Sequence, residues 1–170
     1  MRKFIAASLV LFSGVLLSQM AAAEEPKIET FGDWGYQCEK APNGEGDFCY
    51  VFQNVTKKDT QQLVLGARVA YRPEQKDPLL VVTVPLGTLL PPGAALVLDG
   101  VEGVEPLKLP FFLCAAEGCT TVATGMPSAL IEAMKKAEVA SIRIAAPNKQ
   151  VVGLPLSLKG FTKAIAKIKK

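Results

Sequence analysis

The sequence of 170 residues contains no histidine. Without an imidazole, the chain lacks the general base of the serine triad and the commonest nitrogen ligand of zinc. An excess of charge of one sign is missing too, because 19 basic side chains stand against 16 acidic ones. Binding to nucleic acid relies on a basic surface that displaces counterions. The composition therefore argues against histidine-based enzymes and against a partner of DNA or RNA.

Sequence motifs of catalysis are also missing. The serines beyond the N-terminal segment, Ser128, Ser141 and Ser157, do not stand in G-x-S-x-G and do not begin S-x-x-K. No G-x-G-x-x-G follows a strand-like segment, so a nucleotide cradle is not indicated. We predict a protein that is not an enzyme and that uses no cofactor and no metal.

Carboxylates leave one catalytic alternative open. A hydrolase can work with a pair of carboxylates alone, as glycosidases do. The candidates for such a pair are Asp33, Asp99, Glu102 and Glu105. Turn-forming aspartates and solvated glutamates are the commoner explanation of such residues.

The N-terminal segment has the pattern of a secretory signal peptide. Arg2 and Lys3 precede an apolar run from Phe4 to Leu17, and small residues follow at 21–23. As a helix the run would be about 21 Å long, whereas a bilayer core is about 30 Å thick. We predict a signal peptide over residues 1–23 and a mature domain over residues 24–170, with an uncleaved signal anchor as the alternative.

The four cysteines suggest a disulfide framework. An even number of cysteines in an exported chain is typical of disulfides, and four cysteines allow three pairings. Turn-forming residues separate Cys38 from Cys49, and a tight reversal separates Cys114 from Cys119. We predict these two local bridges. A redox-active pair is the rival interpretation, but the chain has no C-x-x-C.

The mature chain has mainly the pattern of β-strands. Trp34, Tyr36 and Cys38 alternate with Gly35 and Gln37, which indicates one buried face. Further apolar segments recur about every ten residues between turn-forming residues. Strands are predicted within residues 30–54 and at 63–71, 79–84, 86–90, 94–98, 107–113, 141–146 and 150–156. The fold class predicted is a mainly β, single-domain sandwich or barrel.

Two segments have helical periodicity. Pro127–Glu138 predicts a short amphipathic helix that caps one end of the sandwich. At the C-terminus an apolar face is predicted from Leu158, Phe161, Ile165 and Ile168, and a lysine face from Lys159, Lys163, Lys167 and Lys170. A solvated face is the favoured interpretation of these lysines. The alternative is a partner surface that meets an anionic membrane or an acidic protein.

Several short motifs, taken in order, resemble one family. The motifs are Phe31-Gly32-Asp33-Trp34 before Cys38, Cys49 before Gln53, Val84-Pro85-Leu86-Gly87 with Leu89-Leu90 and Gly93, Asp99-Gly100, Cys114 with Gly118-Cys119, and Ser157-Leu158-Lys159-Gly160-Phe161. Together they are similar to the invasion-associated locus B family over nearly the whole mature chain. The resemblance implies an exported envelope protein of a Gram-negative, largely alphaproteobacterial lineage, with a β-sandwich-like domain. In some pathogens this family is linked to entry into host cells such as erythrocytes.

The function predicted from the sequence is binding. We expect an exported, non-enzymatic protein, in the periplasm, at the outer membrane or secreted, that binds an envelope or host-surface protein and contributes to host-cell invasion. The alternative is a periplasmic carrier that holds a small apolar ligand inside the sandwich, suggested by the strongly apolar segments from Leu79 to Leu98.

Overall fold

The computed structural model describes residues 27–41, 44, 46–73 and 75–168, and the predicted signal peptide (residues 1–23) lies outside them. These residues form the strands β1 (Glu29–Phe31), β2 (Trp34–Lys40), β3 (Asp47–Thr56), β4 (Leu63–Ala70), β5 (Leu79–Val84), β6 (Ala94–Val97), β7 (Leu107–Leu109), β8 (Phe111–Ala115), β9 (Gly118–Ala123), β10 (Val139–Ala145) and β11 (Val151–Ser157). The helices are α1 (Ser128–Met134) and α2 (Phe161–Ile168). Neither helix is long and apolar enough to cross a membrane.

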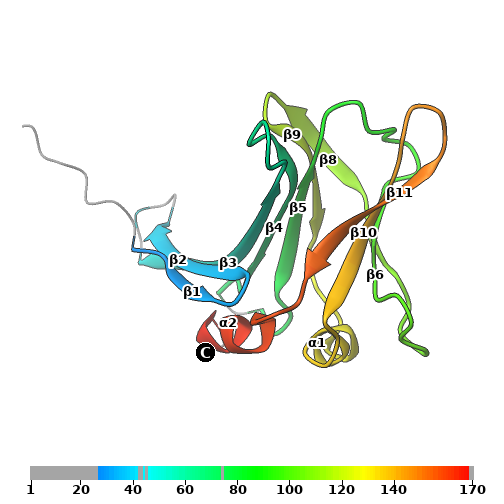
Figure 1. The fold of residues 1–170 in the computed structure, drawn as a ribbon. Coiled ribbons are helices and arrows are strands. Elements are labelled where there is room, and N and C mark those ends of the chain that lie inside the picture. The colour runs from blue at the N-terminus through cyan, green and yellow to red at the C-terminus, as the bar shows by residue number, and fades with distance from the viewer. Residues whose placement is uncertain (1–26, 42–43, 45, 74, 169–170) are drawn as a thin grey trace, which may run out of the picture.

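The strands build two sheets that face each other (Figure 1). The larger sheet has the order β1-β2-β3-β4-β5-β9-β8, and the smaller sheet has the order β11-β10-β6-β7. Neighbouring strands are antiparallel throughout both sheets. The predicted mainly β sandwich is confirmed, and within the described residues the two sheets stay open rather than closing into a barrel.

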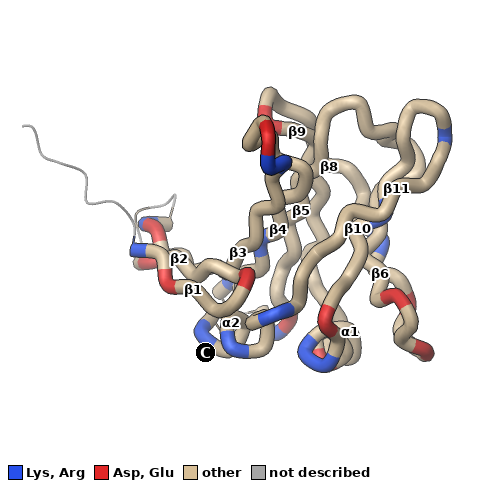
Figure 2. The backbone as a smooth tube through the Cα atoms, in the orientation of Figure 1, with Lys and Arg blue, Asp and Glu red and all other residues tan. Residues whose placement is uncertain are grey.

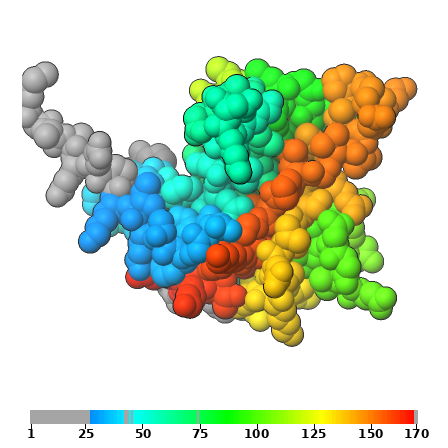
Figure 3. Space-filling model, viewed as in Figure 1, coloured from blue at the N-terminus to red at the C-terminus, as the bar shows by residue number. Residues whose placement is uncertain are grey.

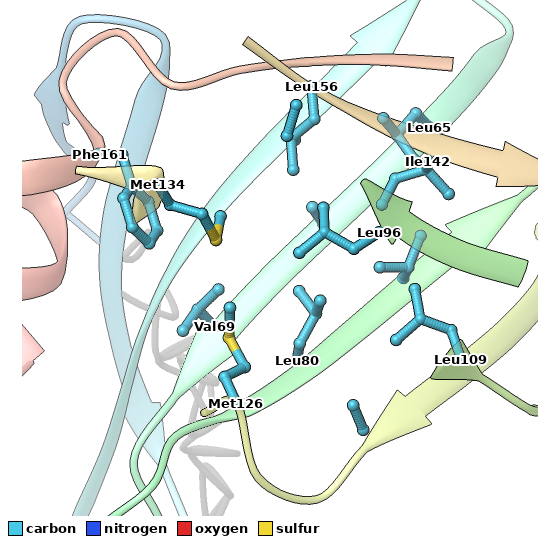
Figure 4. Close-up of a cluster of buried hydrophobic side chains, with 14 of the residues drawn as sticks. Leu65, Val69, Leu80, Leu96, Leu109, Met126, Met134, Ile142, Leu156 and Phe161 are labelled. Atoms are coloured by element: carbon cyan, nitrogen blue, oxygen red, sulfur yellow. The ribbon is translucent and has the colours of Figure 1, made fainter. Parts of the chain in front are cut away.

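Alternation along the strands creates the core between the sheets. In β5 every second residue is buried, and in β4 Leu65, Ala67 and Val69 have no exposed surface. Leu80 of β5, Leu96 of β6 and Ile142 of β10 fill the space from both sides (Figure 4). Burying each such side chain stabilises the fold by about 1.5–3 kcal/mol. The core is therefore filled by protein side chains.

The two helices close the same end of the sandwich (Figure 1). Phe161 of α2 packs against Trp34 of β2 with 5.1 Å between ring centroids, and both side chains are buried. The hydroxyl of Thr162 donates to the carbonyl of Lys135, just after α1, at 3.2 Å. In the view of Figure 3, β11 crosses the molecule as a band that runs from the β10–β11 hairpin to α2.

The predicted strand over 86–90 is wrong. Pro85 lacks a backbone N–H, and Gly87 has a φ of 86°, so the chain turns here. The Thr88 hydroxyl donates to the Pro85 carbonyl at 2.8 Å and holds the turn. Only Leu89 keeps an isolated bridge, to Ala145.

The predicted strand over 107–113 is two strands in different sheets. β7 belongs to the smaller sheet and β8 to the larger one, and the single residue Pro110 joins them. Proline cannot donate to a strand ladder, so it breaks the pairing there. The strand β9, which lies inside the larger sheet, was not predicted, because the sequence around Cys119 indicated only a reversal.

Both helices are shorter than predicted. The helix predicted over 127–138 ends at Met134, because Glu138 already accepts a hydrogen bond from the Leu158 N–H at 2.8 Å. The C-terminal helix begins at Phe161 rather than at Leu158, because Gly160 has a φ of 89° that a right-handed helix cannot contain. Leu158 is nevertheless buried, as the apolar face required.

Candidate functional site

Both predicted disulfides are confirmed, and each joins two neighbouring strands of the larger sheet. Cys38–Cys49 joins β2 to β3, and Cys114–Cys119 joins β8 to β9. The Cα atoms are 4.0 Å apart in both pairs, which is the spacing of the narrow, non-hydrogen-bonded pair of an antiparallel ladder. The backbone N–H and C=O of Cys38 and of Cys114 therefore point away from β3 and β9. For Cys114 this is the open edge of the sheet, because β8 is its last strand, whereas β1 lies on that side of β2.

The motif residues around Trp34 and Ser157 form a structural network. Gln53, which is 5% exposed, donates from Nε2 to the carbonyls of Asp33 and Ser157, both at 3.1 Å. Its Oε1 accepts the Ser157 N–H at 2.9 Å. Trp34 Nε1 donates to the same Ser157 carbonyl at 2.8 Å. This network joins the turn before β2 to the end of β11, far apart in the sequence.

Gly32, before β2, and Gly160, between β11 and α2, allow the backbones of these two segments to approach closely. A Cβ on Gly160 would lie 1.8 Å from the Phe31 carbonyl oxygen, and a Cβ on Gly32 would lie 2.5 Å from the Lys159 carbonyl oxygen. The Asp33 N–H donates to that Lys159 oxygen at 3.0 Å. The first and last of the motifs that carried the family resemblance, together with Gln53, thus hold the two ends of the domain together.

Among the described residues, no hydrogen bond links one candidate carboxylate to another. Asp33 accepts a hydrogen bond from the Ser157 hydroxyl at 2.6 Å, whereas Asp99 forms an ion pair with Arg143 on the smaller sheet. Glu102 and Glu105 lie exposed in the segment between β6 and β7. Within the described residues, no group of three or more histidine, cysteine or acidic side chains could hold a metal ion.

Two of the four lysines of the predicted lysine face lie on α2. Lys159 lies before α2, while Lys163 and Lys167 lie on α2, and Lys170 falls outside the described residues. Lys167 pairs with Glu29 at 3.0 Å and lies 5.6 Å from the centroid of the Tyr36 ring. The apolar side of α2 is buried, so what α2 exposes is mainly charged or small. Basic residues of α2 and of the α1 end lie at the same end of the molecule (Figure 2).

A large apolar groove lies where β7 passes into β8. Its volume is about 1090 Å³, and its lining comes from both sheets. The lining residues are mostly apolar: Leu90, Pro91, Pro92, Gly93, Ala94, Ala95, Glu105, Pro106, Lys108, Leu109, Pro110, Phe111, Phe112, Leu113 and Cys114. Glu105 and Lys108 are the charged residues of this lining. The groove is therefore suited to an apolar occupant.

Phe112 is the most exposed large apolar side chain of the groove. It is 73% exposed, and the neighbouring Leu113 and Leu90 are 46% and 42% exposed. The pairing of β8 with β9 shifts between Phe111 and Leu113, so Phe112 is the extra residue of a β-bulge. A bulge at a sheet edge redirects a side chain, and here the side chain is directed into solvent. Large exposed apolar patches are typical of binding surfaces.

Sequence reasoning missed this groove. The signals were the proline pair Pro91-Pro92 and the run Pro110-Phe111-Phe112, which the residue pattern assigned to a turn and to a buried strand. Periodicity cannot indicate that a proline moves the chain from one sheet to the other, or that a bulge exposes an aromatic ring.

Comparisons with known proteins point to one family. The family profile described as invasion associated locus B (IalB) protein matches residues 34–169. No curated protein sequence matches the chain. Among solved structures, the crystal structure of invasion associated protein B from Bartonella henselae is similar, with a TM-score of 0.71 and 20% identity. The match covers 84% of this chain and 94% of the other, and at this identity it shows a shared fold.

Proposed function

The chain belongs to the invasion-associated locus B family, and we propose that it is an exported, non-enzymatic protein that binds a protein partner through the apolar groove. The exposed Phe112 at the bulge of β8 carries this proposal. Aromatic side chains, phenylalanine included, are enriched in protein interfaces. The partner is a protein of the Gram-negative envelope or of a host-cell surface that presents apolar side chains.

Other features agree with an exported binding protein. Two disulfides are typical of chains that fold in an oxidising compartment, which favours the periplasm, the outer membrane or secretion. The chain has no histidine, and Ser157 and Asp33 are engaged in joining the two ends of the domain. The similar structure from Bartonella henselae is that of an invasion associated protein, and a role of this chain in host-cell entry is part of the proposal.

Crosslinking at Phe112 tests the proposal. A benzophenone amino acid in place of Phe112 should crosslink to one dominant envelope or host-surface protein when the protein is exported in cells. Val151 is 71% exposed on β11, outside the groove, and serves as the matched control position. Equal crosslinking from both positions, or labelling of general periplasmic neighbours alone, would refute the groove as the binding surface.

A substitution gives the quantitative version of this test. Phe112→Glu removes little buried surface, so the fold should be retained. The affinity for the partner should fall by roughly 30-fold or more, because a charged side chain replaces an apolar anchor of the interface. Val151→Glu should leave the affinity unchanged. Loss of binding in both variants would point to general destabilisation and would contradict the assignment of the groove.

A carrier of a small apolar ligand is the second candidate. The interior between the sheets is filled by core side chains, so such a ligand would lie in the groove of about 1090 Å³. Native mass spectrometry of the protein purified from its own host distinguishes the two candidates. A co-purifying small-molecule mass that disappears in Phe112→Glu would favour the carrier.

A further inference from the structure

A second hollow lies on the outer face of the larger sheet. The ladder places Asn54 opposite Gly66, Gly66 opposite Thr83, and Thr83 opposite Thr120. Residues opposite one another in a sheet share a face, and the flanking Leu65 and Ala67 point into the core, so this row faces outward. Because Gly66 has no side chain, the row has a gap at its centre, and the hollow there has a volume of about 220 Å³.

The lining of this hollow is rich in polar groups: Asn54, Arg68, Thr83, Glu117 and Thr120. The hydroxyls of Thr83 and Thr120 lie 3.3 Å apart and bond to each other. Among the described residues, the side-chain amide of Asn54 has no hydrogen-bond partner, and Arg68 and Glu117 have no ion-pair partner. Polar groups of this kind, gathered in one hollow, can bind a ligand with both donors and acceptors.

The two charges lie at opposite ends of the hollow. Arg68 stands opposite Val81, which is two residues from Thr83 in one direction along the sheet. Glu117 lies in the β8–β9 turn, beyond Gly118, which is two residues from Thr120 in the other direction. The Arg68 guanidinium lies 5.7 Å from the centroid of the Tyr50 ring, a contact that restricts its position. The hollow is therefore positive at one end and negative at the other.

We propose that this hollow binds a small zwitterion, either an amino acid or a dipeptide. The ligand's carboxylate pairs with Arg68 and its ammonium group with Glu117, while Asn54 and the two threonines bond to the atoms between. The volume of about 220 Å³ is several times the share of about 30 Å³ that a water molecule takes in the liquid, and it is below the range of drug-sized sites. No residue of this lining belongs to the apolar groove, so the inference goes beyond the proposed function.

Calorimetric titration with four probes tests the proposal. The exported protein is titrated with alanine, alanyl-alanine, N-acetylalanine and alanine methyl ester. Alanine or alanyl-alanine should bind, and which of the two binds more tightly tells the free amino acid from the dipeptide. Each blocked alanine should bind at least 10-fold more weakly than alanine, because it lacks one of the two charges.

Three variants locate the binding. Arg68→Gln and Glu117→Gln should each weaken it by at least 10-fold, because each removes one charged hydrogen-bonding partner. Gly66→Ala should narrow the hollow at its centre and weaken binding without unfolding the protein, since its Cβ would lie 3.4 Å from Asn54 Oδ1 and 3.7 Å from the Thr83 Cβ, which is ordinary contact. Lys108→Gln, in the apolar groove, is the matched control and should bind as the unmodified protein does.

Three results would overturn the proposal. The first is that neither alanine nor alanyl-alanine binds at 10 mM, which is about the weakest affinity of interest. The second is that N-acetylalanine binds as tightly as alanine. The third is that Gly66→Ala binds the ligand as tightly as the unmodified protein does. Phe112→Glu should leave zwitterion binding intact, so a failure of this inference and a failure of the groove proposal are distinguishable.

Discussion

Replacing Gln53 by methionine should destabilise the protein by about 2–4 kcal/mol. Methionine has a similar length and volume, so the change removes hydrogen bonds while leaving little cavity. The side chain is 5% exposed, and it accepts the Ser157 N–H and donates to the Asp33 and Ser157 carbonyls. The Ser157 carbonyl keeps its bond from Trp34, but the Ser157 N–H and the Asp33 carbonyl lose their side-chain partner. Each partly buried group left unpaired costs about 1–3 kcal/mol.

Urea unfolding measures this loss. The midpoint should fall while the slope against urea stays the same, because the change affects the native network and not the area exposed on unfolding. Gln62→Met is the matched control, since Gln62 is exposed and its side chain has no hydrogen bond among the described residues. A loss below 1 kcal/mol for Gln53→Met, or an equal loss for Gln62→Met, would refute the argument that this network holds the two ends of the domain together.

Three further predictions concern other parts of the fold. Gly160→Ala should prevent stable folding, because its Cβ would lie 1.8 Å from the Phe31 carbonyl oxygen; circular dichroism measures this, and a native-like melting temperature would contradict it. Replacing both cysteines of a bridge by serine should lower the free energy of unfolding by about 3 kcal/mol for Cys38–Cys49 and by about 2 kcal/mol for Cys114–Cys119, because the bridges close loops of 11 and 5 residues. Chemical unfolding measures both losses, and a larger loss for Cys114–Cys119 would contradict the loop argument. Burial, with a smaller contribution from the Glu39 carboxylate, raises the pKa of Tyr50 above its ordinary value of 10.0, so the native state holds this proton more tightly than the unfolded state. Stability should therefore fall as pH rises above about 10, less steeply in Tyr50→Phe; unfolding at several alkaline pH values checks this, and equal slopes would contradict it.

Features set by neighbouring residues could be predicted from the sequence. Turn-forming residues lie between Cys38 and Cys49 and between Cys114 and Cys119, and both pairs are bridged as expected. The hairpin of β10 and β11 followed equally from two apolar segments around Pro147 and Asn148. In these cases the partners are close in the chain, so local turn chemistry decides which segments meet.

Features that depend on distant segments could not be predicted. The carbonyl of Ser157 is reached by Trp34 and Gln53, more than 100 residues away, and no periodicity connects them. The groove requires Pro110 to lead the chain from one sheet to the other, and the outer hollow requires Gly66 to stand between Asn54 and Thr83 of other strands. Strand order places these residues together, and it is fixed by packing of the whole domain rather than by any short segment.

The positions of the disulfides also bear on how copies of this protein behave toward one another. Edge strands offer unpaired backbone groups, and a loosened edge strand can pair with a neighbouring molecule or exchange with its equivalent strand. Cys114–Cys119 ties the edge strand β8 to β9, whereas Cys38–Cys49 ties β2, which lies beside the short edge strand β1, to β3. The Cys114–Cys119 link keeps β8 in its own sheet, so β8 is prevented from leaving to join another chain. We expect this bridge to protect the protein from strand exchange, while β8 keeps its bulged aromatic ring exposed.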